Sequence, residues 1–394
     1  MTTCVVRAAR VRDAGGWATR DLVVRDGVLA DVTPAGQAAD ADDGHEVDAA
    51  GWWAAPVLTD AHCHLLPGHL LRLPLYGVGF AMDLFSAPGA RAGLDREAAS
   101  GGARYATAGV GAAVRGGHPY QLVAAGLYPD FPSVAESGGP EAFVRALVAS
   151  GGTVLKVFLD DGRLAGTSLP TFTPREVAEL VAAAHAHDCR VVVHAPSADL
   201  ACVALGAGAD GLAHAPVPES DDQAEELVEV ALRHGAFLVS TLVATASALG
   251  LPQSGSLAGS PVWERVPAGW RAHLRRSGRA APDRAAFDRL LGLVARAHER
   301  GVPVLPGTDA AFPGVVPGAS LHVELELLHR CGVEAHALLD LATAGLRERL
   351  GLGGGRLVRG ARAEVALLDE DPAETVHAWG RLRALVLGTA TLRF

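Results

Sequence analysis

The stretch T-P-R-E-V-A-E-L-V-A-A-A-H-A-H-D-C-R-V-V-V-H-A, residues 173–195, contains a complete helix followed by a strand. Thr173 and Glu176 have capping-box spacing with Pro174 at the first helical position, so a helix is predicted to begin here. The segment R-V-V-V-H-A that follows is short and continuously apolar, which is typical of a strand buried on both faces of a parallel sheet. This unit predicts an α/β fold.

The same alternation continues through the middle of the chain. Helices are predicted to open at Ser220 and to run over 282–301. Roughly eight strands over this length favour a closed barrel over an open doubly wound sheet. No G-x-G-x-x-G follows the first strand, which is a further argument against a dinucleotide fold. The apolar strand-like runs lie at 77–84, 153–159, 190–195, 211–215, 236–242 and 302–309.

The two ends of the chain resemble each other and differ from the middle. Residues 1–56 and 355–394 contain short alternating strands separated by turns such as Asp-Gly. The sequence therefore predicts a (β/α)8 TIM barrel over residues 57–354. A small β-sandwich domain, formed by both chain termini, is predicted to accompany it.

Composition excludes several classes of function. The net charge of −10 and the absence of a basic stripe argue against a nucleic-acid partner. No run is long and apolar enough for a signal peptide or a membrane span, so we expect a cytoplasmic protein with no membrane partner. The five cysteines lack C-x-x-C spacing and are interpreted as free thiols. We expect a small-molecule substrate. The sequence leaves open whether the chain forms a homo-oligomer.

Several predicted strands end in a residue that can bind a metal. Four histidines and a carboxylate at the ends of different strands would meet at one mouth of a barrel, where barrel enzymes build their sites. Neutral imidazoles and a carboxylate are the ligands of zinc and similar divalent ions, and zinc is the first choice. Cys63 stands between His62 and His64, so its side chain points to the opposite face of the strand and is assigned to core packing. The strand-end residues are His62, His64, Lys156, His194, His214 and Asp309.

With these residues in place, the chain resembles a known family. D-A-H-C-H, residues 60–64, is similar to the D-x-H-x-H signature of the amidohydrolase superfamily, and the later strand-end residues follow in that superfamily's order. Gly116-Gly117-His118 resembles an element of its imidazolonepropionase-like and prolidase-like members. The resemblance extends over nearly the whole chain, and it implies a metal-dependent hydrolase.

Lys156 is the only lysine in the chain; every other one of the 34 Lys and Arg residues is arginine. An ammonium buried in an apolar strand loses hydration, so its pKa should fall and the neutral amine should appear. A neutral amine can add carbon dioxide and become a carbamate, which arginine cannot do. The resemblance implies the same modification, because binuclear members of the superfamily use a carboxylated lysine at the matching strand. The alternative is a surviving lysine that snorkels to solvent.

The predicted function is hydrolysis of a C–N bond in an amide, lactam or small peptide. His62, His64 and Asp309 would hold one divalent ion, and His194 and His214 the second. Carboxylated Lys156 and a hydroxide would bridge the two ions. Asp309 would act as general base and then as general acid.

Two other functions are compatible with the same strand-end residues. A non-hydrolytic cyclase or dehydratase could use the same metals. The resemblance implies that a mononuclear deaminase commonly carries glutamate three residues after the strand-five or strand-six histidine. Ser197 and Val217 occupy those positions here, so this function is less favoured.

Two segments are candidates for contact with substrate. Arg115, His118 and Tyr120 lie in a loop after the third barrel strand and could hold a substrate carboxylate, although Arg115 could instead form a salt bridge within the loop. Residues 245–281 are rich in Gly, Pro and Ser and could close over the site. In that case Trp263 and Trp270 would contact substrate; otherwise they would pack against helices or another subunit.

Overall fold

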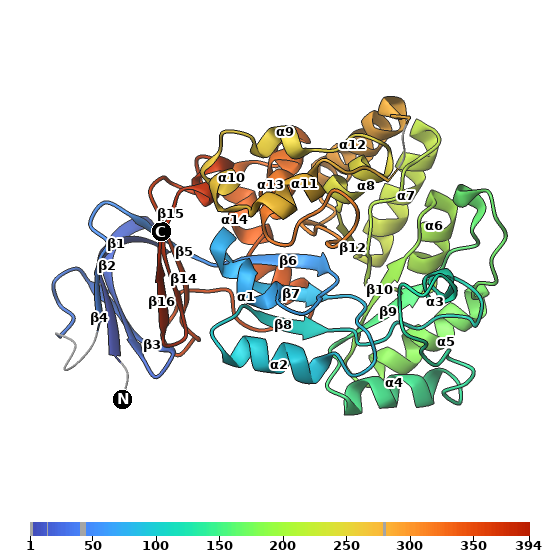
Figure 1. Cartoon of the computed structure of the whole chain (residues 1–394), viewed down its shortest axis with the longest axis horizontal. Helices are drawn as coiled ribbons and strands as arrows, with labels where there is room; N and C mark the ends of the chain where they lie inside the picture. The colour runs from blue at the N-terminus through green and yellow to red at the C-terminus, as the bar shows by residue number, and fades with distance from the viewer. Residues whose placement is uncertain (1–2, 14, 40–44, 279–280) are drawn as a thin grey trace.

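The computed structural model describes residues 3–13, 15–39, 45–278 and 281–394. Figure 1 shows a barrel of parallel strands surrounded by helices, and beside it a sheet that contains both ends of the chain. The predicted α/β barrel with a terminal β-sandwich is therefore confirmed.

The barrel strands form two hydrogen-bonded groups, in the orders β6-β7-β8 and β13-β12-β11-β10-β9. Main-chain hydrogen bonds join the groups into a ring. The amide of Ala61 donates to Pro306 (3.0 Å) on one side, and the amide of Ala112 donates to Lys156 (2.8 Å) on the other. The strands are β6 (Leu58–Cys63), β7 (Val78–Asp83), β8 (Arg104–Thr107), β9 (Val154–Phe158), β10 (Arg190–His194), β11 (Gly211–Leu212), β12 (Phe237–Val239) and β13 (Val304–Leu305).

Side-chain alternation decides which residues face the barrel interior. Val154 and Val192 belong to the apolar cluster that fills the barrel. Lys156 and His194 lie two positions further along the same strands, so they face the interior nearer the carboxyl ends. The ends of the parallel strands thereby gather polar groups at one mouth.

Helices cover the outside of the barrel. Thr173 accepts a hydrogen bond from the amide of Glu176, and the Glu176 side chain returns one to the Thr173 amide, so the predicted capping box is confirmed. Ser220 likewise caps its helix through the amide of Gln223. Among the described residues no helix is long and apolar enough to cross a membrane. The α-helices are α1 (His69–Arg72), α2 (Arg91–Ala99), α3 (Tyr120–Ala124), α4 (Pro140–Ala149), α5 (Pro174–His185), α6 (Ala198–Gly206), α7 (Asp221–His234), α8 (Leu242–Ala248), α9 (Ser254–Leu257), α10 (Pro261–Arg265), α11 (Ala268–Leu274), α12 (Arg284–Glu299), α13 (Ala319–Arg330), α14 (Ala335–Leu341) and α15 (Ala344–Arg349). The 3-10 helices are η1 (Leu73–Tyr76), η2 (Arg163–Ala165) and η3 (Val376–Gly380).

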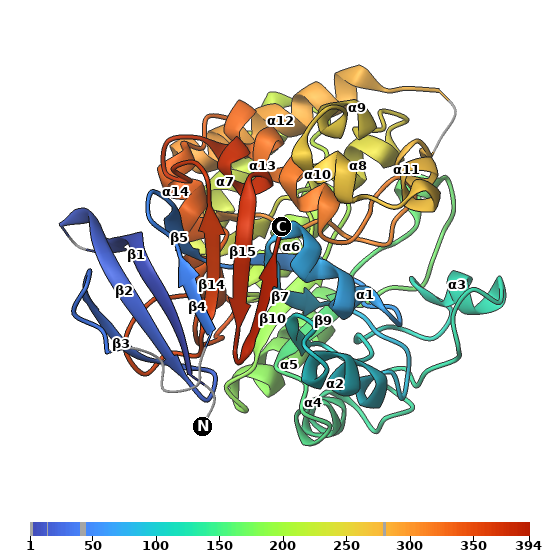
Figure 2. The same cartoon turned by 60° about the vertical axis from the view of Figure 1, so that its left-hand side comes forward.

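The second sheet joins the two chain ends, in the order β16-β15-β14-β5-β1-β2-β3 with β4 beside β1. Figure 2 shows the N-terminal strands in blue next to the C-terminal strands in red. These strands enclose an apolar core of their own. All of them lie within 1–56 and 355–394, while the domain boundaries stay a prediction. The strands are β1 (Thr3–Asp13), β2 (Gly16–Arg25), β3 (Val28–Pro34), β4 (His45–Asp48), β5 (Trp53–Pro56), β14 (Glu364–Leu368), β15 (Leu382–Leu387) and β16 (Ala390–Arg393).

The β2–β3 hairpin follows directly from its sequence. Asp26 and Gly27 connect the strands with φ angles of 47° and 80°. Two positive φ angles suit the right-handed twist of a two-residue hairpin, and Asp-Gly is a favoured pair for that turn. The Asp-Gly dipeptide therefore sets the turn and the two pairs beside it, Arg25–Val28 and Val24–Leu29, beyond which a bulge shifts the register.

Candidate active site

Strand β6 ends in two histidines whose rings are fixed by backbone carbonyls. Nδ1 of His62 lies 2.8 Å from the carbonyl oxygen of Ala213, and Nδ1 of His64 lies 3.1 Å from that of Phe85. A ring nitrogen that donates to a carbonyl carries the proton, which leaves the Nε2 lone pair available. Both Nε2 atoms face Oδ1 of Asp309, at 3.3 Å for His62 and 2.9 Å for His64.

The buried Asp60 ties β6 to the segment that follows β13. Its Oδ1 accepts hydrogen bonds from the amides of His62 (3.1 Å) and Thr308 (3.0 Å), and its Oδ2 accepts one from the Thr308 hydroxyl (2.6 Å). Sequence reasoning gave Asp60 no role, although it opens the D-A-H-C-H motif. Cys63 faces away from the site and its thiol donates to a main-chain carbonyl of β7, as predicted for a core residue.

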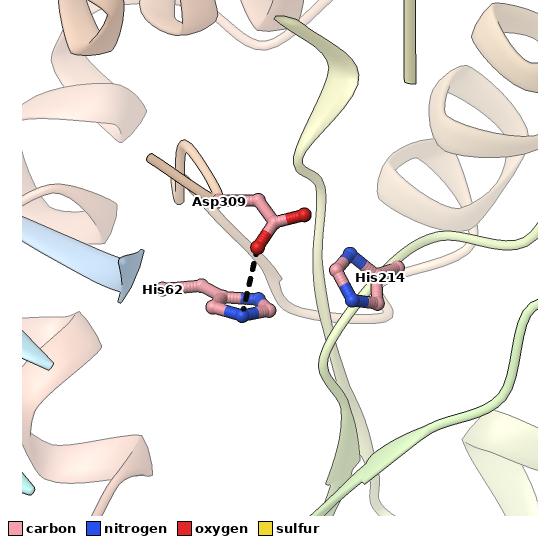
Figure 3. Close-up of side chains that lie close together, drawn as sticks. All are labelled: His62, His214 and Asp309. Carbon is pink, nitrogen blue, oxygen red and sulfur yellow. Dashed lines mark ion pairs between the residues drawn. The ribbon is translucent and has the colours of Figure 1, made fainter. Parts of the chain in front are cut away.

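One candidate ion site combines His62, His214 and Asp309 (Figure 3), whose donor atoms lie within 4.8 Å of one another. Nδ1 of His214 lies 3.0 Å from the hydroxyl of Thr241, which orients that ring. Within the described part of the chain, Nε2 of His62 is buried and has no hydrogen-bond partner. A buried nitrogen without a partner beside a carboxylate requires an explanation, and a cation supplies one.

Burial decides the protonation of this group. It lowers the pKa of His62 and His214 well below the ordinary value, so both imidazoles are neutral at pH 7. Burial acts to raise the pKa of Asp309, but the neighbouring imidazoles lower it more, and the net pKa lies well below its usual range. Two neutral imidazoles and an ionised carboxylate form a ligand set for zinc or a similar ion, so the residues present fit a divalent cation.

The four histidines predicted as ligands form a continuous series of rings. His64 and His62 have centroids 5.1 Å apart, His62 and His214 4.7 Å, and His214 and His194 4.9 Å. These residues come from the ends of three different barrel strands. The fold therefore brings all four together at one mouth.

Lys156 lies on β9 beneath this series and is only 1% exposed. Its Nζ is 5.5 Å from the centre of the Phe158 ring. Burial lowers the pKa of the Lys156 amine to about 7, although the charge of Asp309 acts to raise it. A large fraction of the amine is thus neutral at physiological pH, whereas an exposed lysine would be almost fully protonated.

A second group of metal-type donors surrounds His194. Nε2 of His194 lies 3.6 Å from Oδ2 of Asp160, and Nδ1 of His118 lies 3.9 Å from the same oxygen. The His118 and His194 rings stack, with centroids 4.6 Å apart and planes within 13°. Sequence reasoning missed Asp160; the available signal was an acidic pair directly after the strand that carries Lys156.

The other two candidate substrate residues lie in a network inside their loop. The Arg115 guanidinium contacts Asp130 at 2.6 Å and Glu136 at 2.5 Å, and lies 4.3 Å from the centre of the Tyr120 ring. The Tyr120 hydroxyl donates to the carbonyl of Phe131. Of the three residues suggested by the sequence, only His118 adjoins the histidine series.

The segment 245–281 contains the end of α8 and the short helices α9, α10 and α11, apart from residues 279–280, which lie outside the described residues. Trp263 packs against Arg271 within the segment. Trp270 contacts His69 edge to face and lines a cavity of about 260 Å³. Ala311, two residues after Asp309, also lines this cavity, so Trp270 lies close to the loop that follows β13.

Comparison with known proteins gives one family and several structural relatives. The model of the Amidohydrolase family matches residues 53–388. A Xaa-Pro dipeptidase with bound methionine superposes with a TM-score of 0.77 at 18% identity, covering 100% of both chains. A prolidase complexed with N-methylphosphonate-L-proline gives 0.73 at 19% identity and 99% coverage of both chains. A bottromycin amidohydrolase gives 0.70 at 24% identity, covering 99% of this chain and 87% of the other.

Curated relatives match a shorter region. Uncharacterized proteins of Mycobacterium tuberculosis and Mycobacterium bovis are 28% identical to this chain over 212 residues. The match covers 54% of this chain and 50% of each relative, so it spans about half the length of those proteins.

Proposed function

The chain belongs to the amidohydrolase family, and from this premise we propose that it hydrolyses a C–N bond of an amide, lactam or small peptide. The observation that carries the proposal is that donor atoms of His62, His214 and Asp309 lie within 4.8 Å of one another at a barrel mouth that also contains the buried Lys156 amine. Relatives described as a Xaa-Pro dipeptidase and a prolidase support a small peptide as the substrate.

The proposed ligand assignment has two ions. As the sequence suggests, His62, His64 and Asp309 would hold the first, and His194 and His214 the second, with Lys156 as a carbamate between them. Because His214 lies within 4.8 Å of the His62 and Asp309 donor atoms, the two ions would be close neighbours. A bound divalent ion would polarise the substrate carbonyl and make water a stronger acid. The lowered pKa of Lys156 supports the carbamate, because only the neutral amine attacks carbon dioxide, forming an N–C bond and losing a proton.

Asp309 would perform the proton transfers. Its ionised carboxylate can accept the proton of the attacking water and deliver it to the leaving nitrogen. The hydrogen bonds that the amide and hydroxyl of Thr308 donate to the Asp60 side chain hold the adjoining Asp309 in place. The amide of Asp309 also donates to the carbonyl of His62 at 2.7 Å. A rigid base at this position would not need to reorganise during the reaction.

The test combines metal analysis with a substrate panel. Protein expressed with and without added bicarbonate would be analysed for metal content, and we expect about two divalent ions per chain, with higher occupancy when bicarbonate is supplied. The loaded enzyme would then be assayed on dipeptides, lactams and N-acyl amino acids. Hydrolysis of none of these by fully loaded enzyme would contradict the proposal and favour a non-hydrolytic reaction.

A further inference from the structure

A carboxyl group from a helix outside the barrel is buried against the corner between β12 and α8. Glu324 lies in α13 and its exposed fraction is 0%. Its Oε1 accepts hydrogen bonds from the hydroxyl of Ser240 at 2.5 Å and from the amide of Leu242 at 2.9 Å, and its Oε2 accepts one from the amide of Val243 at 2.8 Å. The two amides are the first of α8, and such amides have no partner within their own helix. Glu324 therefore caps α8 from a different helix.

This external cap takes over a role that the N-cap side chain usually has. Thr241 occupies the N-cap position of α8, where a threonine hydroxyl ordinarily accepts a hydrogen bond from the second or third amide of the helix. Among the described residues the Thr241 hydroxyl accepts no such bond, and it lies 3.0 Å from Nδ1 of His214 instead. Because Glu324 already binds the amide of Val243, the hydroxyl of Thr241 is available to the histidine.

The backbone of Thr241 has a conformation that its neighbours must hold. Its φ and ψ angles are 43° and 36°, in the left-handed region that a β-branched residue rarely adopts. Strain of this kind persists only where surrounding contacts over-determine the conformation, and it is concentrated at functional sites. Glu324 supplies such contacts, because its Oε1 joins Ser240 and Leu242, the residues directly before and after Thr241. The buried carboxyl group thus constrains the one residue that contacts His214.

We propose that Glu324 is a positioning residue for the metal site: it holds the corner at Thr241 so that the threonine hydroxyl fixes the ring of His214. This inference rests on the proposed metal-dependent hydrolysis. When Nδ1 of His214 donates to the Thr241 hydroxyl, the lone pair of Nε2 is left for an ion. The hydrogen bond therefore decides both the tautomer and the orientation of this ligand.

The experiment measures the zinc affinity of the full-length protein by competition with a chelator, so it requires no known substrate. Thr241→Val removes the hydroxyl but keeps the branched shape, and Glu324→Gln replaces one acceptor oxygen with a donor. We expect each variant to bind at least one zinc ion about 10–100-fold more weakly, as for loss of a hydrogen bond that orients a ligand. Thr241→Ser keeps the hydroxyl and should bind zinc as the wild type does.

The double variant tests whether Glu324 acts through Thr241. If both residues act on His214 through one hydrogen bond, Thr241→Val combined with Glu324→Gln should lose little more zinc affinity than either variant alone. Losses that add in full would show that Glu324 does not act through Thr241, and would overturn the inference.

A control on the same helix separates positioning from general stability. His322 is buried in α13, and its Nε2 lies 2.9 Å from the carbonyl oxygen of Tyr76, away from the β12–α8 corner. His322→Leu should lower the free energy of unfolding but leave zinc affinity unchanged. An equal loss of zinc affinity in His322→Leu would attribute the effect to a destabilised α13 and overturn the inference.

The other outcomes are also decisive. Wild-type zinc affinity in Thr241→Val or in Glu324→Gln would overturn the positioning role. If Glu324→Gln does not fold, Ser240→Ala takes its place, because it removes one contact of the same carboxyl group; unchanged zinc affinity in that variant would equally overturn the role. Wild-type protein that binds no zinc or other divalent ion would instead contradict the proposed function.

Discussion

The two mouths of the barrel each bury charged residues, but they do so in opposite ways. At the amino-terminal mouth, the buried Arg347 contacts Glu364 at 2.5 Å and donates through Nε to the hydroxyl of Thr59 at 3.0 Å. Arg104 contacts the other carboxylate oxygen of Glu364 at 3.2 Å. At the carboxyl-terminal mouth, His62 Nε2 lacks a hydrogen-bond partner among the described residues, and the amine of Lys156 is buried.

This difference separates a structural cluster from a functional one. In the Arg347–Glu364 cluster, opposite charges offset part of the lost hydration, although Nη2 of Arg347 has no hydrogen-bond partner among the described residues. In the histidine series, the Asp309 carboxylate faces the rings of His62 and His64. Burial keeps His62 neutral, whereas at His64 burial is outweighed by the hydrogen bond to Asp309 and by its charge, which raise the pKa. A cavity of about 280 Å³ lies beside Arg104 and Glu364, whose charges are paired with each other.

The largest expected effect comes from removing the single lysine. Lys156→Ala should lose at least one metal ion and nearly all activity, and Lys156→Arg should be no better, because a guanidinium stays protonated and forms no carbamate. Metal analysis and turnover would be measured together. Short carboxylic acids added to Lys156→Ala should restore part of the activity. Full metal occupancy and activity in the arginine variant would disprove the carbamate.

Asp309→Asn should have the next largest effect. The amide cannot accept and return a proton, so kcat should fall by about a hundredfold to ten-thousandfold. The melting temperature should change little, because the Asp309 backbone contacts remain. Turnover close to that of wild type would place the general base elsewhere.

Arg347→Met tests the opposite mouth. It leaves Glu364 buried with only the half-exposed Arg104 as partner, so the free energy of unfolding should fall by about 3–5 kcal/mol. Urea denaturation would measure this, with Arg356→Met as a control, since its pair with Glu348 is exposed.

Adding Glu364→Gln to Arg347→Met should recover part of the loss, because the unpaired carboxylate is its main cause. An Arg347→Met variant as stable as wild type would show that the two mouths do not differ in this way.

The smallest effect is expected for Arg115→Ala. Because Asp130 and Glu136 already neutralise this guanidinium, we expect KM to change by less than about threefold for substrates with a carboxylate and for their methyl esters alike. A selective rise in KM for the acids alone would instead identify Arg115 as the carboxylate anchor suggested by the sequence.

Much of the fold was predictable because its signals are local. The Thr173–Glu176 capping box and the Asp26-Gly27 turn each act within a few residues and have the expected geometry. Strand β8 was harder to recognise, because R-Y-A-T is short and only half apolar. The segment 245–281, expected as an insertion rich in turn residues, contains short helices that tertiary packing stabilises.

The sequence by itself determined the barrel, the pairing of the two chain ends and the residues that gather at the mouth. It did so because strand periodicity fixes which side chains point inward and parallel strands end at one edge. Only the tertiary structure decided the partners of those residues. It assigned Arg115 to Asp130 and Glu136, and it brought Asp160 to His118 and His194. Contacts between loops depend on distances across the mouth, which no local pattern in the chain encodes.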